Sequence, residues 1–384
     1  MIPTDNPDLF EPWVDPESNA KSYLLKNVVS PLQQSFYFTN PSMTNDERYL
    51  WFYCSFPPSG NSNYGRMLGA VDFKEGKARW FPETQFLDAS PMVDLNTGEA
   101  FWASGLNIYK RGPRQDDEAV LVNSFPSLIA NNRRLHRLAT HFTYSADKKY
   151  VNIDVQVGSE WFVGDAPLDG SPIRIWHDFD RCYNHGQFSP TDPNLQLIAQ
   201  DHWQDPLTGM RHPYVNRMWL IELVDVEEEE GECWPIYREE KFPHVKVNRH
   251  GHEWWDKDGK HVWYVDYDRG TERVNIETMQ RDLVWPSGNW HSHCSTDGQF
   301  LAGDIHRGIP NDGGRVSFFD RKTNQEINII TEMHLNPTLN NYHIHPHPQF
   351  CCNDKYVVYT IWLGDKSTLA MCPVDELKEK TGSK

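Results

Sequence analysis

The sequence predicts an all-β protein, a seven-bladed β-propeller, from its composition, from a turn motif that recurs along the chain, and from histidines in register with that turn. The chain has 384 residues, of which 13% are aromatic, with 24 Gly and 26 Pro. Aromatic residues favour strands, and Gly and Pro favour the tight turns that join them. The one segment that favours a short helix is PVDELKEKTG near the C-terminus.

The recurring motif is a small or polar residue, a turn containing Asp or Asn, and then an aromatic or β-branched run. Such a turn joins two strands as a hairpin, and a repeat of roughly 40–50 residues with several strands is typical of a propeller blade. Seven units predict a single propeller domain over residues 1–384, with an N-terminal extension of about residues 1–20 and a C-terminal tail of about residues 374–384. An irregular β-sandwich or two β-domains is the alternative. The turn residues are Asp46, Asn96, Asp147, Asp192, Asp258, Asp297 and Asp354.

Charge and hydropathy exclude several classes of partner. The net charge of −17 argues against nucleic-acid binding and against binding to an anionic membrane. No apolar stretch reaches 18 residues, so no membrane-spanning helix is expected. Seven Cys without a regular spacing favour reduced thiols. We therefore expect a cytoplasmic protein (periplasmic if a signal peptide was removed), either a monomer or a homodimer.

A histidine precedes the turn residue by six or seven positions in five of the seven units. This place belongs to the strand that lines the central channel of a propeller, where equivalent positions of successive blades form a ring. The pattern therefore predicts a histidine-lined funnel at one mouth of the channel. The first two units have Asn40 and Ser90 at this place, and the other five have His141, His185, His252, His291 and His347.

The segment NYHIHPHPQF adds two histidines at alternate positions, His343 and His345, before His347. Alternate residues of a strand point to one side, so we expect these imidazoles on one face of an inner strand. Imidazoles bind transition metals, and three of them with open positions form a catalytic type of metal site. We take His291, His345 and His347 as metal ligands and His343 as a fourth candidate.

Five motifs in order resemble the oligogalacturonate lyases, a family of seven-bladed propellers that cleave short uronate oligomers by β-elimination. The resemblance covers roughly residues 183–354, and the first 130 residues resemble the family only in the blade pattern. The motifs are NHGQFSPTDP, NRMWLIEL, GHEWWDKDGKHVWYV, HSHCSTDG and HPHPQF.

The resemblance implies a role for each matching residue. His252 matches the catalytic base, and Arg217 matches the arginine that handles the acid group of the substrate. His291, His345 and His347 match three histidine ligands of a manganese ion, for which Zn²⁺, Ni²⁺ and Ca²⁺ are alternatives. The family has Gln as the fourth ligand three residues before HPHP. Tyr342 stands there in this chain, so His343 or a water would take that place.

The implied partner is an acidic oligosaccharide built from uronate. Carboxylate pairing and substrate subsites need further polar side chains around the funnel, and a general acid must protonate the leaving oxygen. We take His141 and His185 for the subsites and Arg181 and Arg211 for carboxylate pairing. The acid is solvent, His185 or Tyr183. An ulvan lyase or another uronate lyase on the same scaffold is one alternative. A non-catalytic propeller that binds sugar or protein, or a metal-dependent lactonase, is another.

Overall fold

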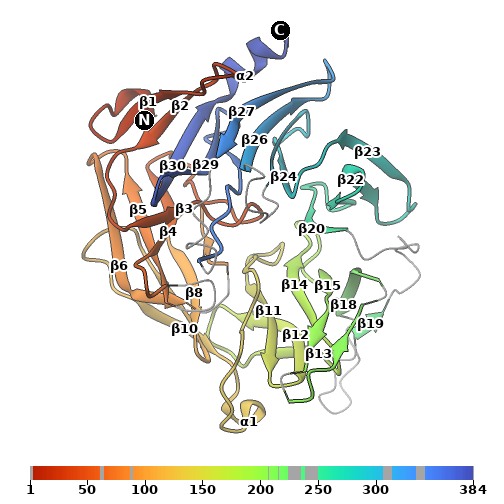
Figure 1. Ribbon diagram of the computed structural model, residues 1–384. Helices are drawn as coiled ribbons and strands as arrows, with labels where there is room; N and C mark the ends of the chain where they lie inside the picture. The colour runs from red at the N-terminus through yellow and green to blue at the C-terminus, as the bar shows by residue number, and fades with distance from the viewer. Residues whose placement is uncertain are drawn as a thin grey trace.

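The computed structural model describes residues 3–60, 65–86, 90–205, 207–214, 216–223, 235–237, 250–305, 314–333 and 342–383. Within them, mostly antiparallel sheets of two to nine strands surround a common centre (Figure 1), as the sequence predicted for a propeller. Each blade begins with its innermost strand and continues outward through hairpins, because the Asp and Asn turns join neighbouring strands.

The first blade is β3–β6, the second is β7–β10 and the third is β11–β13. The third blade has a further inner segment, which a bridge between Tyr144 and Val151 attaches to β11. The strands of these blades are β3 (Leu32–Gln34), β4 (Tyr49–Ser55), β5 (Arg66–Asp72), β6 (Lys77–Phe86), β7 (Met92–Val93), β8 (Ala100–Ser104), β9 (Asn107–Arg111), β10 (Val120–Ser124), β11 (Tyr150–Val157), β12 (Glu160–Pro167) and β13 (Arg174–Phe179).

The fourth blade is β14, β15, β18 and β19, the fifth is β20–β23 and the sixth is β24–β27, while β16 and β17 form a separate hairpin. Their bounds are β14 (Tyr183–Phe188), β15 (Leu195–Gln200), β16 (Trp203–Gln204), β17 (Arg211–His212), β18 (Met218–Leu223), β19 (Pro235–Tyr237), β20 (His250–Trp255), β21 (His261–Asp266), β22 (Gly270–Asn275), β23 (Arg281–Pro286), β24 (His291–Cys294), β25 (Phe300–Ile305), β26 (Gly314–Asp320) and β27 (Gln325–Met333).

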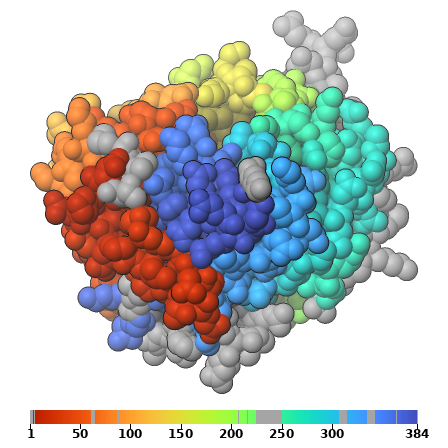
Figure 2. All heavy atoms as spheres, turned by 90° about the horizontal axis from the view of Figure 1, so that it is seen from above, coloured from red at the N-terminus to blue at the C-terminus, as the bar shows by residue number. Residues whose placement is uncertain are grey.

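The seventh blade combines strands from both ends of the chain. Its strands are β28 (Gln349–Cys351), β29 (Tyr356–Leu363), β30 (Lys366–Pro373), β2 (Lys21–Leu25) and β1 (Phe10–Val14). β2 pairs antiparallel with β30, so N-terminal residues complete the last blade. In Figure 2 the red N-terminal atoms lie against the blue C-terminal ones. Part of the segment expected to be an N-terminal extension, β1, therefore pairs within this sheet.

Among the described residues the hydrophobic core consists of seven clusters, and each cluster lies between two consecutive blades. Phe318 of the sixth blade and Tyr359 of the seventh belong to one of them. Another joins the seventh blade to the first through Val358 and Phe52, so the apolar packing runs around the whole ring. Because both faces of the middle strands are covered, strands such as β4 and β11 are buried over most of their length, whereas outer strands such as β10 and β23 are largely exposed.

Helices contribute little to the described residues. They are η1 (Pro3–Asp5), α1 (Ser127–Ala130) and α2 (Val374–Lys380), and α2 confirms the helix predicted near the C-terminus. No helix among the described residues has the length and apolar character needed to cross a membrane.

The pairing of β2 with β30 predicts a large effect of core mutations in β2. Leu24 is 3% exposed and packs between the sixth and seventh blades. We expect Leu24→Ala to lower the free energy of unfolding by about 2–5 kcal/mol, because it leaves a cavity. Urea titration measures this change. Val14→Ala on β1, where the side chain is 49% exposed, is the matched control and should cost less than about 0.5 kcal/mol. Equal effects of the two substitutions would contradict the role of β2 in closing the ring.

Candidate metal centre and cavity

A cavity of about 850 Å³ lies on the inner side of the fourth to seventh blades, and Tyr37 also lines it. Polar and aromatic side chains line it, a composition that suits a polar ligand with flat apolar faces. The sequence-predicted residues among its lining are His185, Arg211, Arg217, His252, His291, His343 and His345.

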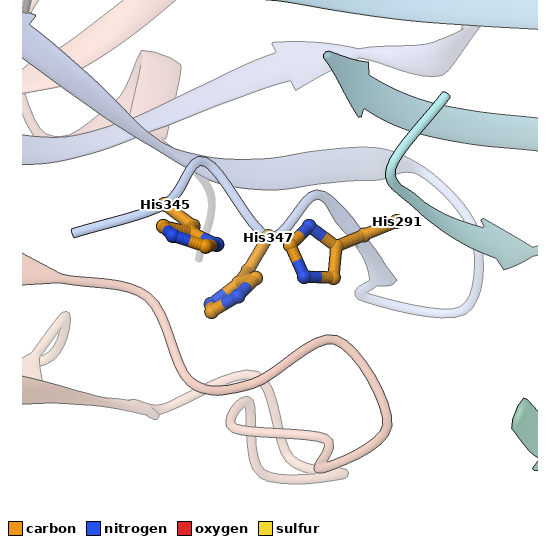
Figure 3. A group of neighbouring side chains, drawn as sticks. All are labelled: His291, His345 and His347. Atoms are coloured by element: carbon orange, nitrogen blue, oxygen red, sulfur yellow. The ribbon is translucent and has the colours of Figure 1, made fainter. Parts of the chain in front are cut away.

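Three histidines form a compact cluster beside this cavity. One ring nitrogen each of His291, His345 and His347 lies within 4.8 Å of the others, and all three residues are buried. Figure 3 shows His291 on a strand of the sixth blade and the other two on the irregular segment before β28, with the three rings facing one another. Two of the predicted ligands therefore come from one blade and the third from its neighbour.

Asp304 on β25 holds this cluster in place. Its carboxylate oxygens lie 2.8 and 3.1 Å from Nδ1 of His291, and the side chain is fully buried. The backbone N–H of His347 donates to the same carboxylate at 2.9 Å. A carboxylate on Nδ1 keeps the proton there, so Nε2 is the nitrogen that can bind a metal. One carboxylate thus orients two of the three histidines.

The residues present fit a divalent metal ion. Neither ring nitrogen of His347 has a hydrogen-bond partner among the described residues, although both are buried. Burial lowers the pKa of His347 well below its ordinary 6.5, with smaller contributions from neighbouring histidines, so the ring is neutral. Neutral imidazole is the form that binds metal. Buried polar atoms without partners are unfavourable, and a cation among these three rings would satisfy one of the two nitrogens of His347.

The expectation that residues 343–347 form a strand is wrong. The segment from His343 to Pro348 has no strand pairing, and β28 begins only at Gln349. Pro346 and Pro348 have no N–H to donate to a ladder, which prevents regular pairing. His343 and His347 have positive φ of 50° and 43°, so local turns rather than strand alternation direct their rings.

The position where the resembled family has its fourth ligand is occupied by a core residue. Tyr342 is 8% exposed and packs in the cluster between the sixth and seventh blades. His343 is exposed and lines the cavity, with its ring centroid 4.2 Å from that of His345. Among the described residues, the compact group consists of three histidines, and His343 lies beside it.

Two inner strands carry a histidine on a β-bulge. The pairing of β14 with β15 shifts around His185, and that of β20 with β21 shifts around His252. Both histidines have left-handed backbones, with φ of 53° and 54°. This conformation is unfavourable for most residues, and bulges beside functional sites redirect side chains. The side chains of His185 and His252 both line the cavity.

Tyr37 lies at the centre of the histidine ring. Its ring stacks on His141 at a centroid distance of 4.5 Å and meets His347 edge-on at 5.0 Å. The side-chain amide of Gln349 holds this segment by donating to the backbone carbonyl of Tyr37 at 2.6 Å. His141 Nε2 lies 2.8 Å from His185 Nδ1, so the histidines of successive blades contact one another. Tyr37 precedes the first turn motif and has no place in the histidine register, so the sequence pattern did not indicate it.

Arg217 is a buried cation between two carboxylates. Its Nε and Nη2 donate to Glu253 at 3.1 and 3.3 Å, and its Nη1 lies 3.5 Å from Asp201. Burial lowers the pKa of Arg217, but Glu253 and Asp201 outweigh burial and raise it above the ordinary value. Arg217 therefore stays positively charged, and the two carboxylates balance this charge in the absence of a ligand.

Three other predicted residues occupy different surroundings. Arg211 is exposed at the cavity rim. Arg181 is exposed, pairs with Asp180 and does not line the cavity. Tyr183 is buried in the core between the third and fourth blades, where it stacks on Phe179 with centroids 4.0 Å apart.

Comparison with solved structures shows the same fold in two proteins. An oligogalacturonate lyase from Vibrio parahaemolyticus matches with a TM-score of 0.71 and 17% identity over 95% of this chain and 96% of that chain. An oligogalacturonate lyase in complex with manganese matches with a TM-score of 0.67 and 16% identity over 95% and 96% of the two chains. At these identities the likeness shows the fold. It therefore confirms, for the fold, the resemblance found in the sequence. No family model matches the sequence, and no curated protein matches it.

Removing the charge of Asp304 should weaken metal binding. In Asp304→Asn the amide no longer fixes Nδ1–H of His291, and we expect the affinity for Mn²⁺ or Zn²⁺ to fall about 10–100-fold. Isothermal titration calorimetry measures the affinity. Asp320→Asn, which changes a fully buried carboxylate on β26, is the matched control and should bind metal like the wild type. Unchanged affinity in Asp304→Asn would contradict the orienting role.

The buried His141 should make the metal-free protein sensitive to acid. Burial, with smaller contributions from Arg137 and Arg217, lowers the pKa of His141 to about 3. The pKa of a histidine in the unfolded chain is near 6.5. Between pH 6.5 and about pH 3, the unfolded state therefore binds one more proton at His141 than the folded state does. The contribution of His141 to stability is therefore complete above pH 6.5 and falls by about 1.4 kcal/mol per pH unit below it.

Urea titrations between pH 7 and pH 4 in the presence of a chelator test this dependence. His141→Gln should show a shallower loss of stability with falling pH, by about one proton. The exposed His136→Gln is the control and should keep the wild-type slope. The same slope in all three proteins would refute the assignment.

Proposed function

We propose that the protein is a lyase of the oligogalacturonate lyase family, which cleaves uronate-containing oligosaccharides by metal-assisted β-elimination. The observation that carries this proposal is the position of His252. Its ring centroid lies 4.1 Å from that of the ligand candidate His291, and it shares one cavity wall with Arg217. A base, a cation site and a guanidinium thus converge in a fold shared with two such lyases.

β-Elimination requires loss of the weakly acidic C5 proton next to the uronate carboxylate. His252 is the candidate base. Burial, followed by the charges of His291 and Arg217, lowers its pKa well below 6.5, so the ring is neutral and able to accept a proton. A divalent ion held by His291, His345 and His347 would supply positive charge for the carboxylate and for the enolate-like charge that develops.

The flanking groups favour an acidic ligand only if such a cation is present. Glu253 and Asp201 already balance Arg217, which lines the same cavity as Asp201. Arg211 adds charge at the rim. We therefore assign Arg217 to orienting the substrate carboxylate, while the metal provides the net attraction.

Manganese is the first candidate for the ion, because one of the two similar lyases is described in complex with manganese. Zn²⁺, Ni²⁺ and Ca²⁺ are the alternatives, and a donor set of three imidazoles accommodates Zn²⁺ or Ni²⁺ as well. Oligomers derived from pectin are the first substrate candidates. The six described cysteines are free, which suits a reducing, cytoplasmic compartment.

The proposal predicts that His252→Asn abolishes product formation without unfolding the protein. Asn tolerates the left-handed backbone at this position, so the fold should survive. We expect the rate of formation of unsaturated uronate from oligogalacturonate, followed by its ultraviolet absorbance, to fall by at least about 100-fold. His177→Asn in β13, outside the cavity lining, is the matched control and should retain the wild-type rate.

Because Tyr342 replaces the fourth ligand of the resembled family, the substrate panel should also contain ulvan and other uronate oligomers. Each substrate is tested with Mn²⁺, Zn²⁺ and Ni²⁺ added separately. If the wild type forms no unsaturated product from any of them, the lyase proposal is wrong and a non-catalytic sugar-binding propeller becomes the better explanation.

A further inference from the structure

Tyr267 contacts the proposed base directly. It follows β21 at the turn into β22, and its Oη lies 2.8 Å from Nδ1 of His252. Its ring stands edge-on to the imidazole with centroids 5.7 Å apart and packs against Trp290 at 5.3 Å. Tyr267 also lines the cavity that contains His252 and Arg217. Base and phenol therefore come from one blade and face one space.

Gly251 makes this approach sterically feasible. A Cβ atom at this position would lie 2.7 Å from Oη of Tyr267 and 3.2 Å from Nε of Arg217. Any other residue before His252 would displace the phenol, the guanidinium or both. The absence of a side chain thus brings an imidazole, a phenol and a guanidinium to one point.

The phenol keeps its proton in this environment. Burial raises the pKa of Tyr267 above its ordinary value, and the opposing contribution of Arg217 is smaller. If Nδ1 of His252 carries a proton, it donates to Oη of Tyr267 at the observed distance. In this tautomer the hydroxyl proton of Tyr267 can point to another acceptor and Nε2 of His252 carries no proton, while the imidazole also has a hydrogen-bond contact with the backbone of Trp290.

We propose that Tyr267 is the general acid of the elimination, donating its proton to the leaving glycosidic oxygen while His252 takes the C5 proton. This inference rests on the proposed lyase function. The C5–H bond breaks and its proton moves to Nε2 of His252, while the C4–C5 double bond forms. The C4–O4 bond breaks with its electron pair on O4, which takes the proton of Tyr267.

The proton balance closes within the His252–Tyr267 pair. The imidazolium formed at His252 passes its Nδ1 proton to the oxygen of Tyr267, so both residues end neutral. The imidazole then carries its proton on Nε2 instead of Nδ1, and exchange with water restores the starting tautomer. No oxidant, reductant or further acid is needed, because one hydrogen bond links base and acid.

A substrate whose leaving group needs no proton separates this role from mere orientation of His252. In a methyl glycoside of 4-deoxy-4-fluoro-galacturonate the leaving group is fluoride, which departs with little help from an acid. A general acid is therefore dispensable for this substrate, whereas a residue that only positions His252 matters equally for both substrates. Fluoride release and unsaturated product are measured for each variant relative to the wild type, with bound metal quantified in every protein.

We expect Tyr267→Phe to lose at least about 100-fold in rate on oligogalacturonate and less than about fivefold on the fluoro substrate, with wild-type metal content. His252→Asn should lose both activities. Tyr264→Phe removes another buried hydroxyl of the same blade, one bonded to Glu272 away from the cavity, and should change neither rate.

Equal losses of Tyr267→Phe on the two substrates would overturn the acid role and leave a positioning role. No loss on either substrate would also overturn it. A wild type that acts on neither substrate would instead refute the lyase function itself. Gly251→Ala provides a second variant, because its Cβ displaces the hydroxyl of Tyr267 while the ring remains. It should depress the rate on oligogalacturonate more than the rate on the fluoro substrate, and the reverse order would count against the proposal.

Discussion

Closure of the ring by β2 and β30 is the constraint on which the rest of the structure depends. Each hydrophobic cluster lies between two blades, so every blade requires a neighbour on both sides. The functional side chains depend on the same arrangement, because the ring histidines come from five different blades. Contacts such as that between His252 and His291 exist only while neighbouring blades keep their spacing. Packing of the core and geometry of the cavity therefore depend on the same contacts between neighbouring blades.

The electrostatics of the cavity complement this architecture. The protein carries a net charge of −17, yet the proposed ligand is acidic. Burial keeps His185 and His252 neutral by lowering their pKa values, and two carboxylates balance Arg217. An ion bound to the three-histidine cluster would thus be the main source of attraction for an anion. Metal binding and substrate binding would then be coupled by charge, and Asp304 would influence both through the ligand that it orients.

Patterns that repeat within one blade were predictable from the sequence, whereas contacts between elements were not. The turn residues identified the hairpins, and the register of histidines identified the residues that meet around Tyr37. The pattern could not show that Pro346 and Pro348 interrupt the strand, or that Tyr183 faces the core. The sequence contained one indication of the role of Asp304. It is a carboxylate within the apolar strand FLAGDI, and an acid in a buried strand requires a partner. The sequence contained no indication that Tyr267 contacts His252, because this contact depends on the bulge in β20.

The origin of the seventh blade has a consequence for the order of folding. During synthesis on the ribosome, β2 emerges long before β30, and the two strands pair across almost the whole chain. Earlier blades can form their hairpins locally, but the seventh must wait for its last strand. Because contacts between distant segments form slowly, β2 stays without its partner until late. The histidine cluster also includes residues just before β28, so a nascent chain would acquire its metal only after the seventh blade has begun to assemble.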